Sequence, residues 1–290
     1  MASITIPPRA AGICLVAASA AFFSTAGIFT RGTAAAAWVI IFWRGLAAAG
    51  FTLAWLAVRG ALAAEVRALD RRGWLIAVMG AAGSAAFIPA FKLSSVANVA
   101  LIYAAAPFAA AALAWLALRE RPPARVMLAS AAALGGVAVI VSGSLGKGSL
   151  AGDGLALFMT LMMAGIMTAY RKWPEVTAAF PNAVSSLLLP VAVLCVPVAE
   201  VPAEELPVLV LFGLAFAVAS VTLCEGARRL PAAETALLSA LETPLAPLLA
   251  FLILAERPGP QTMAGGVVIL AAVLWSQRPA RRRGAPTACR

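Results

Sequence analysis

Long apolar runs follow one another along the whole chain of 290 residues, and only short polar or Gly/Pro-rich segments separate them. A helix that crosses a bilayer needs about 20 mainly apolar residues. Because 63% of the residues are hydrophobic and 12% are charged, no stretch is left for a separate soluble domain. The sequence therefore predicts an all-α membrane protein with ten transmembrane helices, over residues 10–30, 34–58, 73–91, 96–118, 125–143, 152–170, 182–199, 206–226, 233–255 and 260–277.

The positive charges predict how these helices are oriented. Short cytoplasmic loops of membrane proteins carry an excess of Lys and Arg. If both termini are cytoplasmic, 17 of the 22 Lys and Arg residues fall on the cytoplasmic side and 4 on the outer side, while Arg44 lies inside the second span. One missed or invented helix would remove this bias, so the bias supports the number ten. The predicted location is a bacterial inner membrane.

The chain also contains an internal repeat. Three pairs of segments match: residues 26–30 with 164–168, 93–107 with 230–244, and 120–122 with 256–258. In the second pair, Pro107 stands opposite Pro244 and Ala105 opposite Glu242. The repeat predicts a first five-helix half at 1–146, a second at 147–278, and a basic cytoplasmic tail at 279–290.

Five helices per half is an odd number, so the second half should enter the membrane from the opposite face. Inverted repeats of this kind are the architecture of many secondary transporters, which place their substrate site between the repeats. If the two halves exchange packings, a central cavity opens to the other side. The alternative is a duplication that merely enlarged a membrane scaffold.

Several segments resemble one known family. They are Phe42–Arg44, residues 94–101 with Pro107 and 116–120, and residues 230–233, 241–244 and 254–257. On these residues the sequence resembles the drug/metabolite transporter superfamily, in its ten-helix branch with two EamA-type repeats. The resemblance implies a carrier, often an exporter of amino acids or other metabolites.

The sequence therefore predicts a secondary transporter that exports a small metabolite, with aromatic amino acids favoured, by alternating access. Helices 1–4 and 6–9 of the ten should form the central cavity. One alternative is a proton-coupled exporter of lipophilic cations, although the first span contains no acidic residue. Another is a membrane protein that does not transport, such as a lipid-modifying enzyme.

Two charged side chains lie inside predicted spans, where a charge is costly and usually faces a partner or a cavity. Arg44 could bind a substrate carboxylate through two hydrogen bonds or form a structural pair. Glu242, with Pro244 two residues later, could couple protons, bind an amine or hydrogen-bond internally. Glu225 lies near Arg228 and Arg229, which favours an ion pair at the membrane interface.

The remaining candidates are aromatic or small and polar. Tyr103 and Phe108 flank Pro107 in the middle of a predicted span, so they could line a stacking surface or pack in the core. Serine hydroxyls could orient a ligand or bond back to their own helix. The complete set of candidate substrate-binding residues is Ser24, Trp43, Arg44, Phe87, Tyr103, Pro107, Phe108, Ser239, Glu242 and Pro244.

The sequence contains no motif for catalysis or cofactor binding. It has no histidine, four scattered cysteines, and no P-loop, nucleophile elbow or HExxH. We therefore expect no enzyme, cofactor or metal. The net charge of +10 is accounted for by loops between spans, so we expect no nucleic-acid partner, only a small-molecule substrate and the bilayer.

Paired glycines occur in the fifth and tenth spans, at Gly135-Gly136 and Gly265-Gly266. Small residues let membrane helices approach closely. These two helices could therefore form a static pair within the chain or the interface of a homodimer, and the protein is expected to be a monomer or such a homodimer.

Overall fold

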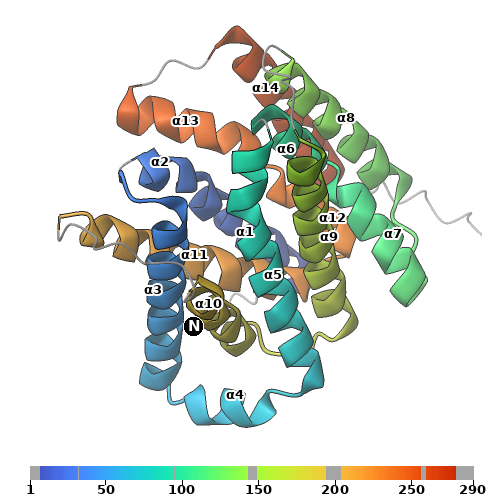
Figure 1. Cartoon of the computed structure of the whole chain (residues 1–290). Helices are drawn as coiled ribbons and strands as arrows, with labels where there is room; N and C mark the ends of the chain where they lie inside the picture. The colour runs from blue at the N-terminus through green and yellow to red at the C-terminus, as the bar shows by residue number, and fades with distance from the viewer. Residues whose placement is uncertain are drawn as a thin grey trace, which may run out of the picture.

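The computed structural model describes residues 7–31, 33–94, 96–142, 149–193, 204–255 and 259–278. Within these residues the chain is all-helical and contains no strand (Figure 1). The helices are α1 (Pro8–Ser24), α2 (Ala26–Arg31), α3 (Ala37–Val58), α4 (Leu62–Ala68), α5 (Arg71–Leu93), α6 (Val96–Tyr103), α7 (Ala106–Leu118), α8 (Ala124–Val141), α9 (Leu150–Lys172), α10 (Ala179–Val193), α11 (Leu206–Ala227), α12 (Ala232–Ser239), α13 (Glu242–Leu254) and α14 (Pro260–Gln277).

Seven of the spans in the described chain are long and apolar enough to cross a membrane. They are Pro8–Phe29, Trp38–Val58, Asn98–Leu118, Ala124–Val141, Leu150–Lys172, Leu206–Ala227 and Ala232–Ile253. The other three expected spans fall on α5, α10 and α14, which do not meet the same criterion, and residues 194–199 of the seventh lie outside the described residues. The helical class is confirmed, whereas the number ten stays a prediction.

Two helical segments are interrupted at matching places. Helix α6 has 8 residues and α7 has 13, and the same lengths recur in α12 and α13. Both α7 and α13 end on a left-handed residue that is not glycine, Arg119 (φ 57°) and Ala255 (φ 56°). Helices α8 and α14 then follow with 18 residues each. The structure thus contains the repeat that the sequence suggested.

This repeat corrects the alignment made from sequence. Helices α6, α7 and α8 begin and end 136 residues before α12, α13 and α14, respectively. For example, α7 starts at Ala106 and α13 at Glu242. The pairing of Ala105 with Glu242 was therefore wrong by one residue. Pro107 and Pro244 caused the error, because they stand at the second position of α7 and the third of α13 rather than at equivalent positions.

Proline explains why both helices break where they do. A proline has no N–H for the helical ladder, and its ring clashes with the carbonyl four residues earlier. Just before Pro107, Ala105 bonds three residues back, to Ile102 O at 3.1 Å. Just before Pro244, Leu241 bonds to Leu238 O at 3.1 Å in the same way. Each break is therefore a two-residue turn between two helices, closed by a hydrogen bond to the residue three positions earlier.

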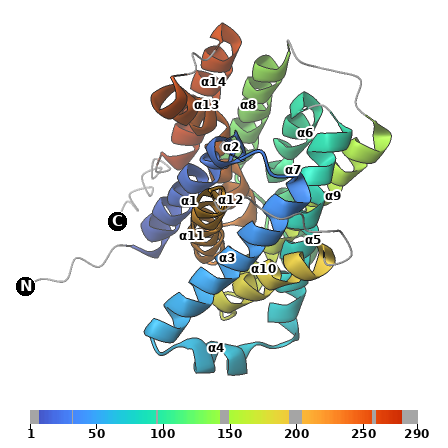
Figure 2. The ribbon, with the colours of Figure 1, turned by 60° about the vertical axis from the view of Figure 1, so that its left-hand side comes forward.

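Helices from the two repeats pack against one another throughout the molecule. Helix α5 packs on α9, α1 on α11, and α3 on both α10 and α11. The short helix α4 joins α3 to α5 at the bottom of the view in Figure 2. Helices α8 and α14 lie together away from α3, α5 and α10 in both views (Figures 1 and 2). Much of the packing inside the molecule is therefore between the repeats rather than within one of them.

The last helix of each repeat contacts the other through glycine. A Cβ atom added at Gly136 would lie 2.8 Å from the carbonyl oxygen of Gly265, so the two backbones touch with no side chain between them. Gly135 faces open space, and Gly266 lies against Pro244. The expected close approach of these helices is thus confirmed within one chain, while a homodimer through the same helices is not tested.

Candidate functional site

A small cavity lies where the two interrupted helices meet. From the first repeat it is lined by Tyr103, Ala104, Ala106 and Pro107, and from the second by Ala236, Ser239, Ala240 and Thr243, with Met167 of α9 between them. Six of these residues form equivalent pairs at the 136-residue spacing, such as Tyr103 with Ser239 and Pro107 with Thr243. The cavity therefore lies on the symmetry element that relates the repeats.

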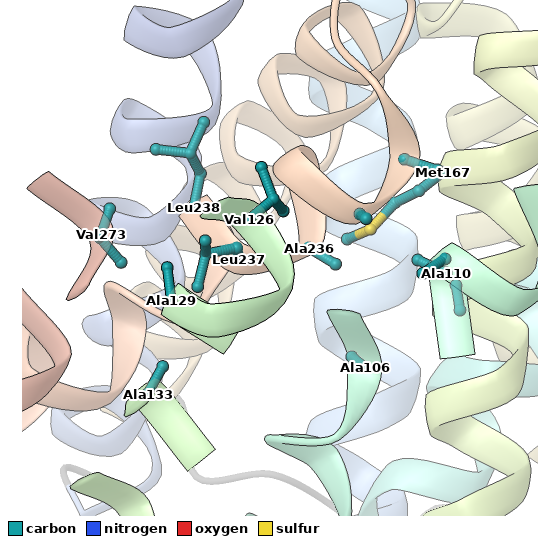
Figure 3. Close-up of a cluster of buried hydrophobic side chains, with 14 of the residues drawn as sticks. Ala106, Ala110, Val126, Ala129, Ala133, Met167, Ala236, Leu237, Leu238 and Val273 are labelled. Carbon is teal, nitrogen blue, oxygen red and sulfur yellow. The ribbon is translucent and has the colours of Figure 1, made fainter. Parts of the chain in front are cut away.

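The walls of the cavity are mainly apolar. Figure 3 shows Met167 pointing into the space between Ala236 on α12 and Ala110 on α7, within the largest buried apolar cluster. The cavity has a volume of about 20 Å³. That is room for about one water molecule, so an amino acid could enter only if the helices around the cavity moved apart.

Glu242 adds a carboxylate next to this cavity. It is the first residue of α13 and directly precedes Thr243, which lines the cavity. Among the described residues it forms no ion pair with Lys or Arg. Pro244 is turned toward α14, where it lies against Gly266. Of the predicted site residues, Tyr103, Pro107 and Ser239 line the cavity, Glu242 borders it, and Pro244 does not line it.

Arg44 occupies a second polar position in the interior. It is 5% exposed, and its Nη2 atom donates a hydrogen bond to Ser84 Oγ at 2.7 Å. Its guanidinium carbon lies 4.2 Å from the ring centre of Phe216 and 5.5 Å from that of Phe212. Its Nε has no hydrogen-bond partner among the described residues, and no described carboxylate pairs with it. The cation is thus held by two aromatic faces and one hydroxyl.

A chain of aromatic contacts connects Arg44 to the cavity. Phe216, which faces the guanidinium, packs edge-on against Phe23 of α1 with ring centres 5.8 Å apart. Phe23 in turn packs against the apolar cluster that contains Ala106, Met167 and Ala236. These packed side chains, rather than the cavity lined by Tyr103 and Ser239, link the two sites.

The other predicted residues are placed as follows. Ser24 is buried and donates to Ala21 O of its own helix at 2.7 Å, and Ser239 donates to Thr235 O at 3.0 Å while still lining the cavity. Trp43 packs edge-on against Phe42, and its Nε1 atom is buried without a partner in the described chain. Phe87 is 39% exposed on α5, and Phe108 is partly buried.

Several residues at these two positions were missed from sequence. Met167 and Thr243 line the cavity, and Ser84, Phe212 and Phe216 surround Arg44. Met167 had a usable signal, because it lies in the segment 164–168 that matches 26–30. The residues around Arg44 had none, since they come from α5 and α11, whose positions relative to α3 follow only from tertiary packing.

The ion pair predicted for Glu225 is confirmed. Its carboxylate binds Arg228 Nη1 at 2.6 Å and Arg229 Nη1 at 2.5 Å. All three residues lie at the end of α11, next to the turn that leads into α12. Within the described residues, no group of three or more Cys, Asp or Glu could hold a metal ion.

A membrane protein built from two repeats that meet at a shared cavity has the architecture of a secondary transporter. The sequence matches the EamA-like transporter family twice, over residues 10–142 and 147–277. The chain therefore belongs to this family of small-molecule transporters, and both repeats of the family pattern are present.

Comparison with solved structures supports the fold. One crystal structure superposes with a TM-score of 0.84 at 17% sequence identity, and the match covers 94% of this chain and 99% of the other. At this identity the likeness concerns the fold alone. A comparison with curated proteins gives no match.

Proposed function

We propose that the protein exports a small metabolite across a bacterial inner membrane by alternating access, with amino acids as the substrate class and aromatic ones favoured. The proposal includes ten spans in two inverted halves, 1–146 and 147–278, with both termini and the tail 279–290 in the cytoplasm. The observation that carries it is the cavity lined by equivalent residues of both repeats.

Two features of the interior support an amino acid. Arg44 is a buried cation without a described carboxylate partner, and a guanidinium binds carboxylates well because its donors match the two oxygens. Glu242 is a carboxylate without a described basic partner and could receive an ammonium group. An amino acid carries a group complementary to each of them, and in this conformation it could meet only one at a time, because the rings of Phe216 and Phe23 lie between Arg44 and the cavity. Tyr103 offers an aromatic surface in the cavity, which favours substrates with a ring.

The polar contacts on the surface support the assignment of the loops to two opposite faces. The ion pairs Arg171–Glu120 (2.7 Å) and Arg72–Glu175 (2.5 Å) join segments that the charge bias assigns to the cytoplasm. The hydroxyl of Thr33 donates to Glu205, which joins two segments assigned to the outer side. No such contact joins a described segment of one side to one of the other.

Counterflow in liposomes tests the proposal. Purified protein is reconstituted in vesicles loaded with one unlabelled amino acid, and uptake of the labelled form is followed for a panel of aromatic, aliphatic and charged amino acids. Uptake of phenylalanine, tyrosine or tryptophan above that of empty vesicles is expected. Uptake of none of the panel would refute the amino-acid proposal.

The competing function is proton-coupled export of lipophilic cations, which Glu242 favours. A carboxylate beside an apolar cavity can attract a cation and release a proton. In that case Glu242→Gln abolishes cation efflux and its coupling to a pH gradient. If the same variant merely lowers amino-acid counterflow, the carboxylate serves substrate binding instead.

A further inference from the structure

Two junctions between the repeats are equivalent to each other but lie at opposite ends of the molecule. In the Arg9 junction, the start of α1 (Arg9, Gly12) meets the turn from α11 to α12 (Arg229, Leu230, Glu234). In the Asp153 junction, the start of α9 (Ser149, Gly152, Asp153) meets the turn from α5 to α6 (Leu93, Ser94, Asn98). Leu93, Ser94 and Asn98 precede Arg229, Leu230 and Glu234 by the same 136 residues that relate the rest of the repeat.

Both junctions are closed tightly in the structure. A Cβ at Gly12 would lie 3.0 Å from Arg229 Cβ and 3.0 Å from Leu230 Cγ. A Cβ at Gly152 would lie 2.5 Å from the backbone nitrogen of Ser94. At Gly152 a larger residue would collide with the backbone of Leu93 and Ser94, and at Gly12 it would require Arg229 and Leu230 to shift by a few tenths of an ångström. The cavity between these closed ends is small, with a volume of about 20 Å³.

Helix α9 extends from one junction to the other, so its length gives the distance between them. It begins at the Asp153 junction, and just beyond its end Pro174 O accepts a hydrogen bond from Arg228 Nε at 2.6 Å, next to Arg229 of the Arg9 junction. At 1.5 Å per residue, the 20 residues from Gly152 to Lys172 span about 30 Å, the thickness of the hydrocarbon core. The junctions therefore lie near the two surfaces of the membrane.

A short helix leads from each junction to the cavity. Helix α12 contains Glu234 of the Arg9 junction and ends at Ser239 in the cavity wall. Helix α6 contains Asn98 of the Asp153 junction and ends at Tyr103 in the same wall. In each helix the two residues are five apart, about 7.5 Å along the axis. A displacement of either short helix therefore acts on a junction and on the cavity together.

The two junctions differ in chemistry. In the Arg9 junction, Arg9 Nη2 binds Glu234 Oε1 at 2.7 Å, and the glutamate side chain is 6% exposed whereas the arginine is 55% exposed. In the Asp153 junction, the carboxylate accepts hydrogen bonds from the hydroxyl of Ser94 and from Asn98 Nδ2, the latter at 3.4 Å. One end is thus closed by an ion pair, and the other by hydrogen bonds from neutral groups.

We propose that the two junctions are the alternating gates of the carrier, with Arg9–Glu234 as an ionic lock on one face and Asp153 with Ser94 as the gate on the other. This inference rests on the proposed function. Loss of the ion pair opens the cavity to the Arg9 face only. Loss of the Asp153 carboxylate opens it to the opposite face only.

Thiol accessibility tests the gates without any substrate. Ser239→Cys serves as the reporter in the cavity, in a background in which the four native cysteines are replaced. A membrane-impermeant thiol reagent is applied from either side of oriented vesicles. In Glu234→Gln, modification from the Arg9 face is expected to be about tenfold faster, which corresponds to about 1.4 kcal/mol of gate stability. In Asp153→Asn the increase is expected from the opposite face.

The control is Glu175→Gln, which breaks the Arg72–Glu175 pair, an ion pair between exposed side chains on the same face as Arg9. It should leave the modification rate unchanged. Arg9→Gln removes the exposed partner of the same ion pair. This variant tests the lock if Glu234→Gln, which changes a buried residue, does not fold. Equal rates in the lock and control variants, or an increase from both faces, would overturn the inference. A one-sided increase without counterflow of any amino acid would sustain the gates and refute the proposed substrate.

Discussion

The glycine contact between α8 and α14 allows a prediction in which two neighbouring residues give opposite results. In Gly136→Ala, the new Cβ lies 2.8 Å from Gly265 O and 2.8 Å from Ile269 Cγ1, whereas ordinary contact begins at 3.4 Å. The helices must therefore separate by about 0.6 Å, and overpacking of this kind costs about 1–3 kcal/mol. In Gly135→Ala, the new Cβ meets nothing within 4 Å.

The intrinsic preference for helix acts equally at both positions. Replacing glycine by alanine inside a helix stabilises it by about 0.5–1 kcal/mol. Subtracting this gain leaves a net loss of up to about 2.5 kcal/mol for Gly136→Ala, while Gly135→Ala keeps the whole gain. Each variant adds one methyl group to the wild type, and the two positions are adjacent in the chain. Effects of lipid and detergent on the unfolding midpoint therefore largely cancel when the two variants are compared.

The measurement is the midpoint of thermal unfolding of purified protein in one detergent. Gly136→Ala should unfold below the wild type and Gly135→Ala at or above it. Combining Gly136→Ala with Gly265→Ala should cost less than the sum of the single changes, because the first methyl has already separated the helices. If both single variants shifted the midpoint equally and in the same direction, the α8–α14 contact inferred from the structure would be wrong.

Three further outcomes are expected. Arg44→Lys should lower counterflow of amino acids and leave that of uncharged analogues unchanged. Lysine keeps the charge but loses the planar group that faces Phe216 and that binds a carboxylate through two hydrogen bonds. An equal loss for both kinds of substrate would assign Arg44 a structural role. Ala255→Gly should raise the unfolding midpoint, since a left-handed residue with a Cβ is strained by about 1 kcal/mol, whereas the same change at Ala250, inside α13, should lower it. Glu120→Gln should reduce the free energy of unfolding by less than about 1 kcal/mol, because both side chains of the Arg171–Glu120 pair are one-third exposed. A larger loss would show that the pair is better shielded from solvent than this exposure indicates.

Local patterns were sufficient to predict the all-helical class, the repeat and several of the helices. Apolar length defined α3, α9 and α11, whose ends fall within a few residues of the expected spans. Charge and spacing also predicted the Glu225 ion pair correctly, since its partners lie three and four residues along the same stretch of chain. In these cases the interacting groups are close in sequence, so their geometry follows from the helix itself.

Features that depend on packing between helices were predicted less well. The predicted pairing of Ala105 with Glu242 was wrong by one residue, because Pro107 and Pro244 do not occupy equivalent positions in α7 and α13. The surroundings of Arg44 could not be predicted, since Ser84 and Phe216 lie 40 and 172 residues away along the chain. Ser24 was a candidate because its side chain is polar, but its hydroxyl already donates to the carbonyl of Ala21 in the same helix.

The direct backbone contact between α8 and α14 also has a practical use. Two helices that touch at Gly136 and Gly265 have no side chains between them that could rearrange, so their separation should be the same in every state of a transport cycle. Spin or fluorescent labels on their exposed faces, for instance at Ala138 and Val267, would provide a fixed internal ruler. Distances from that ruler to labels elsewhere would then report movement of the other helices, free of tumbling of the whole protein.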